Sequence, residues 1–217
     1  MRFSRELNAT DDRSHFVDCR AGHAARAGLL PIVDGRHLSP FRLDLAAVGR
    51  GITRARARTL LDEAATFGRD RLCCRDVAGA ANRTTLIAAV LPPGVVSTHT
   101  VWCARPALAA HDRWCLLGLL NSLPVNYLVR MQMTMHVSAA LLARLPVPRP
   151  LAGTAPHAEL GTLARRLAST PDDDAFARLN ALVSSSYGLT AEEHAHVVST
   201  FPLLPAALRA RIVGAFG

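Results

Sequence analysis

The sequence contains no lysine, so all 25 of its basic residues are arginine. This absence excludes the lysine of a phosphate-binding loop, a Schiff-base lysine, and a nuclease centre that needs a catalytic lysine beside its acidic metal ligands. Arginine instead offers a planar fork of donors that matches the oxygens of a phosphate and the edge of guanine. The basic residues therefore favour anion recognition over lysine-dependent chemistry.

Cysteine is scarce, and apolar runs are short. The five cysteines are an odd number and include no CxxC pair, so we expect free thiols and no zinc site. No stretch of about 18 uncharged apolar residues occurs, so no membrane span is expected. The opening stretch, MRFSRELNATDDRSHF, lacks the apolar core of a signal peptide, which predicts a cytoplasmic protein.

Catalytic and cofactor motifs are also missing. An adenine methyltransferase needs Asn, Asp or Ser before Pro-Pro and an aromatic residue after it, but the one Pro-Pro lies between Leu91 and Gly94. The pair Gly49 and Gly51 is typical of a plain turn rather than a dinucleotide loop. There is no GxSxG or HExxH motif, and the sequence predicts no catalytic residue, cofactor site or metal ligand in this chain.

The charge is unevenly distributed along the chain. Residues 1–83 contain 15 arginines and 10 acidic residues, and residues 84–150 contain 5 arginines and a single acidic residue. Residues 151–217 contain 5 arginines and 6 acidic residues. The front two thirds therefore produce the positive field, which is typical either of a polyanion partner or of a generally basic surface.

Hydrophobic patterning predicts an α+β fold: a mixed β-sheet domain with packed helices over residues 1–150, then a small helical subdomain over 151–217. Two apolar patches flank the turn signal Asp34-Gly35, and further strands are expected at 72–76, 84–91 and 95–103. A helix is expected over 53–67, and its first-turn arginines form either a solvated face or a phosphate contact. Another helix is expected over 112–121 with Asp112 as its N-cap, followed by helices after Pro124 and over SAALLARL.

The Pro-rich segment from Pro146 to Pro150 is the best domain boundary, because only helical patterns follow it. Gly188 is expected to end one helix in the left-handed conformation. Thr190 and Glu193 have the spacing of a capping box at the start of the next helix. His194 and His196 are two residues apart, so they cannot share one helix face, and we expect both to be exposed.

The segment CRDVAGAANRTTLIAAVLPPG, which ends at Gly94, places polar residues directly before an apolar run. One interpretation is a structural network that fixes the connection to a buried strand. The alternative is that Arg75 and Arg83 contact phosphate or bases, while Asp76 orients an arginine fork and Asn82 caps a turn or reads adenine. Near the later buried helix, Asn121, Ser122 and Asn126 are typical of helix caps.

Several blocks resemble one family: PIVDGRHLSPFRLDL, CRDVAGAANRTTLIAAVLPPGVVSTHT, LLGLLNSLPVNYLVRMQM, ARLPVPRP and the tail LNALVSSSYGLTAEEHAHVVSTFP. They resemble the C-terminal target-recognition domain of type II adenine-specific DNA methyltransferases, especially the specificity region of fused restriction-modification enzymes, which is related to the TaqI-like specificity domain. The resemblance covers nearly the whole chain.

The resemblance implies a domain that holds double-stranded DNA while a methyltransferase domain or subunit, absent from this chain, flips and methylates adenine with S-adenosylmethionine. The expected DNA-binding residues are Arg36, His37, Arg42, Arg75, Asn82, Arg83, Thr84 and Arg130, with Asp76 and Asn121 in structural roles. The alternative is an assembly module that docks on a methyltransferase subunit without binding DNA. An independent enzyme with an unrecognised site is the third possibility.

Overall fold

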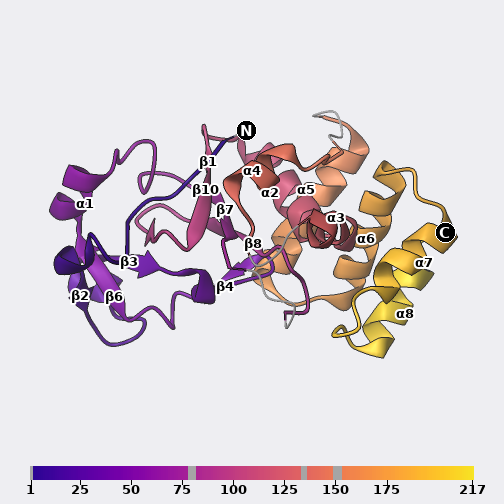
Figure 1. The fold of residues 1–217 in the computed structure, drawn as a ribbon, viewed down its shortest axis with the longest axis horizontal. Helices are drawn as coiled ribbons and strands as arrows, with labels where there is room; N and C mark the ends of the chain where they lie inside the picture. Colours follow the sequence, from indigo (N-terminus) through magenta and orange to yellow (C-terminus); the bar gives the residue numbers. More distant parts are fainter. Residues whose placement is uncertain (1, 78–81, 133–135, 149–152) are drawn as a thin grey trace.

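A computed structural model describes residues 2–77, 82–132, 136–148 and 153–217. Figure 1 shows an elongated molecule, with two β-sheets toward one end and a layered group of helices toward the other. Strands and helices are interspersed over the first part of the chain, and helices alone follow Pro148. The predicted α+β class is confirmed.

One four-stranded sheet lies toward the end of the molecule away from the C-terminal helices (Figure 1), in the order β2-β6-β3-β9. Its strands are β2 (Val17–Asp18), β6 (Arg50–Thr53), β3 (Leu29–Val33) and β9 (Val96–Ser97). Pairing is antiparallel except between β3 and β9, which are parallel. Short 3-10 turns precede and follow β3, at Ala25–Ala27 and Gly35–His37, and another lies at Arg13–His15.

The second four-stranded sheet is entirely antiparallel, in the order β1-β10-β7-β8. Its strands are β1 (Arg2–Ser4), β10 (Val101–Arg105), β7 (Arg71–Arg75) and β8 (Ala88–Leu91). A small hairpin, β4 (Leu38–Ser39) with β5 (Arg42–Leu43), lies against β8. Its turn includes Phe41 at a φ of 68°, a conformation that non-glycine residues rarely adopt.

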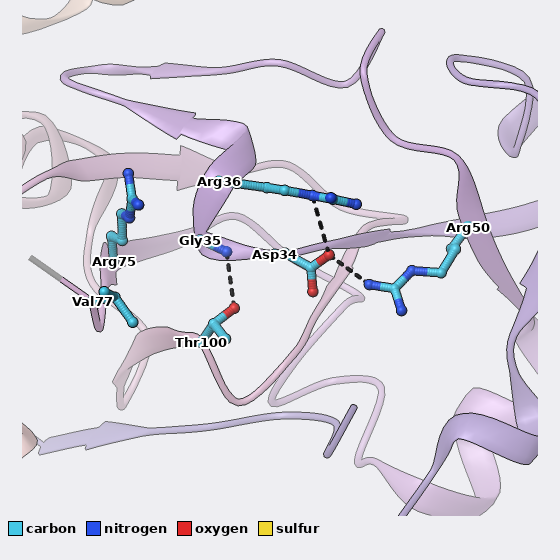
Figure 2. Close-up of a pocket in the computed structure, with 7 residues that line it drawn as sticks. All are labelled: Asp34, Gly35, Arg36, Arg50, Arg75, Val77 and Thr100. Atoms are coloured by element: carbon cyan, nitrogen blue, oxygen red, sulfur yellow. Dashed lines mark hydrogen bonds and ion pairs between the residues drawn. The ribbon is translucent and has the colours of Figure 1, made fainter. Parts of the chain in front are cut away.

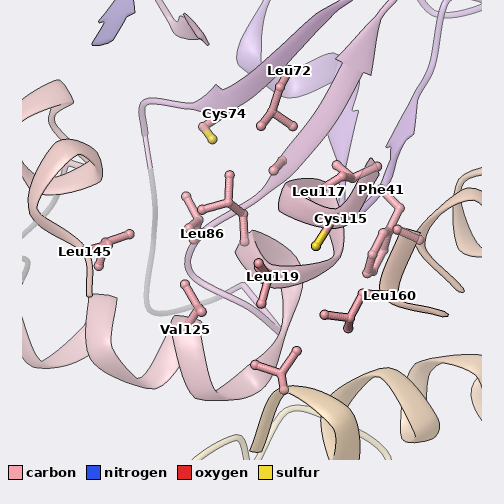
Figure 3. Packing of buried hydrophobic residues seen from close by; sticks show 14 of the residues in the cluster. Phe41, Leu72, Cys74, Leu86, Cys115, Leu117, Leu119, Val125, Leu145 and Leu160 are labelled. Carbon is pink, nitrogen blue, oxygen red and sulfur yellow. The ribbon is translucent and has the colours of Figure 1, made fainter. Parts of the chain in front are cut away.

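The helices cover the second sheet and extend from it. They are α2 (Ala110–Asn121), α3 (Leu123–Gln132), α4 (Ala139–Arg144), α5 (Ala155–Ser169), α6 (Asp173–Ser186), α7 (Ala191–Ser199) and α8 (Ala206–Gly214). Apolar side chains of β7, α2, α3 and α5 meet in one core, in which Leu72, Leu117, Val125 and Leu160 lie close together (Figure 3). The predicted boundary at residue 150 lies outside the described residues, and the shared core joins α5 and α6 to the sheet.

The structure corrects several sequence-based expectations. The helix expected over 53–67 is the shorter α1 (Arg54–Leu60), which ends where Leu61 becomes extended, and Glu63 beyond it pairs with Arg54 and Arg58. The strand expected over 95–103 is divided into β9 and β10, since Thr98 and Thr100 bond to each other and to the turn after β3.

Two further expectations about helix residues were wrong. The N-cap of α2 is Ala109, and Asp112 instead contacts His157 of α5 with an Oδ1–Nε2 distance of 3.1 Å. His194, which was expected to be exposed, is buried at 1% exposure, because its ring lies between Ser184 of α6 and the carbonyl of Ile212 in α8. The expectations for Gly188, at a φ of 70°, and for the Thr190–Glu193 capping box are confirmed.

A buried carboxylate joins the two sheets. Glu6 lies in the segment after β1, and both its side chain and that of Arg71 are fully buried, with a 3.0 Å Oε1–Nε distance. Arg105 donates to the same oxygen at 3.0 Å, and Ser97 of β9 donates to Oε2 from its main-chain N–H and its hydroxyl. The terminal nitrogens Nη1 and Nη2 of Arg71 donate to the carbonyls of residues 66, 69 and 95, so acceptors surround the end of its guanidinium.

Buried asparagines replace strand pairing in the segment that leads into β8. The Oδ1 of Asn126 accepts from the main-chain N–H groups of Thr85 and Leu86 at 2.9 and 2.7 Å. Asn121 forms a reciprocal pair with the N–H and carbonyl of Ala88, each at 3.0 Å. Both side chains are fully buried, so these amides satisfy polar groups that water cannot reach.

Glu6→Gln should strongly destabilise the chain, because Arg71 would remain buried without a counter-charge. Breaking a buried pair in this way costs about 3–5 kcal/mol. Urea unfolding followed by circular dichroism measures the loss. The control is Glu159→Gln, which removes the exposed ion pair with Arg178 and should cost at most about 1 kcal/mol. Equal losses for the two variants would contradict the structural role of Glu6.

Asn126→Ala should also destabilise the chain, because two buried N–H groups would lose their acceptor. Each unsatisfied group costs about 1–3 kcal/mol. The matched control is Gln132→Ala, which removes an exposed amide at the end of the same helix and should change stability by less than about 0.5 kcal/mol. A loss for Asn126→Ala no larger than that of the control would show that water reaches this site.

Candidate nucleic-acid interface

A pocket of about 560 Å³ opens between the two sheets and contains three arginines. Asp34 and Gly35 follow β3, Arg50 begins β6, Arg75 ends β7, and Thr100 precedes β10. The lining residues are Asp34, Gly35, Arg36, Arg50, Arg75, Val77 and Thr100. Figure 2 shows Arg75 on one side of the Gly35 turn and Arg50 on the other, with Arg36 extending over Asp34.

Asp34 organises the centre of this pocket, which we call the arginine pocket. Its Oδ2 accepts from Arg50 at 2.6 Å, and its Oδ1 accepts from the hydroxyl of Thr98 at 2.9 Å. The hydroxyl of Thr100 lies 2.9 Å from that of Thr98 and accepts from the N–H of Gly35 at 2.9 Å. The carboxylate therefore fixes Arg50 and the adjoining turn, while three guanidinium groups leave the pocket with an excess of positive charge.

The predicted residues of the DGRH turn have different environments. Arg36 has a 70% exposed side chain whose Nε lies 3.8 Å from Asp34, and Arg42 is exposed on β5. His37 is 5% exposed, and its Nδ1 accepts from the N–H of Asp34 at 2.9 Å. Burial lowers the pKa of His37, which favours the neutral ring that this acceptor role requires.

The polar cluster after β7 consists of Asn82, Arg83, Thr84 and Thr85, and Arg130 holds it through hydrogen bonds within the fold. Asn82 is half-buried, Arg83 is exposed, and Thr84 is buried with no partner for its hydroxyl among the described residues. Arg130 donates to the Thr85 hydroxyl at 2.8 Å and to the carbonyl of Thr200 at 2.7 Å, and its guanidinium lies 4.0 Å from the centre of the Phe201 ring. Its donors therefore join the cluster to the end of α7.

The two residues expected to be structural are both buried. Asp76 accepts from Arg5 at 2.8 Å and from the indole N–H of Trp102 at 3.3 Å, so the arginine that it orients is Arg5 rather than Arg75 or Arg83. Arg5 also lies over the Trp102 ring, 4.2 Å from its centre. Asn121 pairs with Ala88, as described above.

The pairing of arginines differs along the chain. In residues 153–217, three of the five arginines pair with carboxylates: Arg166 with Asp172, Arg178 with Glu159, and Arg211 with Asp174. Among the described residues of the front part, a set of exposed arginines has no carboxylate within ion-pair distance: Arg2, Arg20, Arg26, Arg42, Arg56, Arg83 and Arg144. The positive field is therefore available mainly outside helices α5–α8.

Sequence reasoning did not single out Arg50, although it completes the arginine pocket. The available signal was a charged residue between two glycines at the start of a strand, in VGRGI. Thr98 and Glu6 were also missed, because their partners are distant in the sequence.

The described residues contain no cluster of three or more His, Cys, Asp or Glu side chains that could bind a metal ion. Within the same residues, no helix is both long enough and apolar enough to cross a membrane. The arrangement offers hydrogen-bond donors and positive charge, which suit a phosphate or a base edge.

No family model and no curated protein matches the chain. Among solved structures, it is similar to the type IIL restriction-modification enzyme MmeI, determined in complex with DNA. The TM-score is 0.58 at 14% sequence identity, over 99% of this chain and 34% of the enzyme chain. The chain therefore spans about a third of that protein's length, and the likeness establishes a shared fold with a part of a restriction-modification enzyme.

The neutral state of His37 makes stability depend on pH. Because burial lowers its pKa in the folded chain, the unfolded chain binds a proton more readily as pH falls below about 6.5. The free energy of unfolding should therefore decrease from pH 7.5 to 5.5. His37→Asn keeps an acceptor but does not titrate, so its decrease should be smaller in urea unfolding at both pH values.

The matched control for this pH dependence is His196→Asn, at an exposed histidine on α7. It should show the same decrease as the unaltered chain. His194 contributes in the same direction as His37, because burial lowers its pKa too, so some pH dependence should persist in His37→Asn. An unchanged decrease in His37→Asn would refute the assignment.

Proposed function

We propose that this chain is the DNA target-recognition domain of a restriction-modification system, in which it binds duplex DNA for an adenine-specific methyltransferase. The observation that carries the proposal is the fold shared, over 99% of the chain, with part of an enzyme determined in complex with DNA. The surplus of unpaired arginines outside helices α5–α8 supports it, because phosphate contacts dominate the affinity of DNA-binding proteins.

In this proposal, the arginine pocket and the surrounding exposed arginines face the duplex. Arg36, Arg42 and Arg83 extend into solvent and suit phosphate contacts that set the register on DNA. His37, Thr84 and Arg130 do not extend toward the DNA in this proposal. His37 and Thr84 are buried, and His37 and Arg130 form hydrogen bonds within the fold. The methyl transfer and its S-adenosylmethionine belong to a catalytic domain or subunit outside this chain.

The duplex-binding proposal predicts affinity that decreases steeply with salt. Fluorescence anisotropy with a random-sequence duplex at several salt concentrations measures it, and log K should fall linearly with log salt. The double variant Arg36→Ala/Arg42→Ala should bind more weakly on all sequences and reduce the slope by about two, one for each lost phosphate contact.

The charge-matched control is Arg165→Ala/Arg209→Ala, which removes two arginines of α5 and α8 that have no carboxylate partner. It should leave affinity and slope unchanged. No binding at low salt would overturn the proposal and favour a module that docks on a methyltransferase subunit. Equal losses for the two double variants would overturn the placement of the DNA on the surface that carries Arg36 and Arg42.

A further inference from the structure

We propose that Arg75 is a base-reading residue that recognises a guanine in the DNA duplex, whereas Arg36 and Arg50 in the same pocket do not. The inference rests on the proposed function and adds a chemical class of base and a division of roles among the three arginines.

The main chain of Arg75 is fixed on both sides. It is the last residue of β7, where it pairs with Val101 of β10, and its N–H donates to the carbonyl of Ile87 at 2.9 Å. A base-reading side chain needs such a rigid support, because an error of a fraction of an ångström disrupts two simultaneous hydrogen bonds. A phosphate contact tolerates more freedom, since it carries no sequence information.

The aliphatic part of Arg75 passes closely over Gly35. A Cβ placed on Gly35 would lie 3.0 Å from Cγ of Arg75 and 3.0 Å from the carbonyl oxygen of Thr100. A side chain at position 35 would therefore require the stem of Arg75 or the Thr100 carbonyl to shift by a few tenths of an ångström. The turn itself is fixed by the bond between the Gly35 N–H and the Thr100 hydroxyl.

The guanidinium of Arg75 is available to a ligand. It has no hydrogen-bond or ion-pair partner among the residues that the structure describes, although it lines the pocket. Arg50 differs, because it donates to Asp34 at 2.6 Å and its side chain is 22% exposed. Arg36 also pairs with Asp34, with a 3.8 Å Nε–Oδ2 distance, and its side chain is 70% exposed.

The donor geometry of Arg75 selects guanine. In the major groove guanine presents two acceptors, N7 and O6, which a guanidinium can bind with two parallel hydrogen bonds. Adenine presents one acceptor and one donor, and cytosine presents a donor, so neither accepts two bonds from an arginine. Asp34 instead accepts from Arg50 and Thr98, and no ion pair joins it to Arg75 among the described residues.

The experiment selects bound sequences from a random duplex pool with the unaltered chain and with Arg75→Ala, Arg75→Lys and Gly35→Ala. The unaltered chain should enrich guanine at one position or more. Arg75→Ala should remove that preference at one position and weaken binding to the selected sequence about 5- to 150-fold, with little change on random duplex. Arg75→Lys keeps the charge but not the fork, so it should lose the same preference.

Gly35→Ala tests the positioning role of the turn, and Arg36→Ala is the control within the pocket. Gly35→Ala should reduce the guanine preference without changing the salt slope, because it displaces Arg75 and removes no charge. Arg36→Ala should weaken binding equally on all sequences and keep the preference. Circular dichroism at 25 °C and thermal unfolding establish that each variant is folded.

Three results would overturn the inference. If Arg75→Ala weakened binding equally on all sequences, Arg75 would be a phosphate contact. If the unaltered chain bound the pool with steep salt dependence but without a guanine preference that Arg75 controls, the base-reading role would fail while the proposed function stood. If the unaltered chain did not bind duplex DNA at low salt, both would fail.

Discussion

The buried carboxylate of Glu6 is the interaction on which the arrangement of the two sheets depends. It lies between Arg71 of β7, Arg105 of β10 and Ser97 of β9, so three strands from both sheets converge on one side chain. The buried guanidinium of Arg71 is further stabilised because main-chain carbonyls accept hydrogen bonds from both of its terminal nitrogens. The same strand that carries Arg71 at its start carries Arg75 at its end, so the network also fixes one wall of the arginine pocket.

Buried asparagine side chains are a second constraint, because they accept main-chain hydrogen bonds that a neighbouring strand would otherwise accept. Residues 85–87 enter the core before β8 begins, and the buried N–H groups of Thr85 and Leu86 need acceptors there. Asn126 accepts from both, Asn121 accepts from Ala88 at the start of β8, and Asn180 accepts from Leu123 at the start of α3. The polar cluster that precedes β8 therefore has two parts. Thr84 and Thr85 are buried next to these amides, and Arg83 is exposed to solvent.

Local signals predicted much of the fold, and long-range pairing explains the rest. The Asp34-Gly35 turn, Gly188 and the Thr190–Glu193 box depend on neighbours within a few residues, so their patterns are visible in the sequence. His194 is buried because Ile212 of α8, 18 residues further along the chain, covers it, and no local pattern contains that fact. Glu6 and Arg71 are separated by 64 intervening residues, which places their pairing beyond any periodicity argument.

The arginine pocket shows why the charge of the sequence can indicate a DNA-binding surface but cannot identify a residue that recognises a base. The sequence contains 25 arginines, and folding sorts them by partner: Arg71 into the core, Arg50 onto Asp34, Arg130 onto Phe201, and three of the five in the tail onto carboxylates. Asp34 is used here with Thr98 and Thr100 to fix a turn against Arg75, which is the support that reading a base edge requires and that charge attraction alone does not.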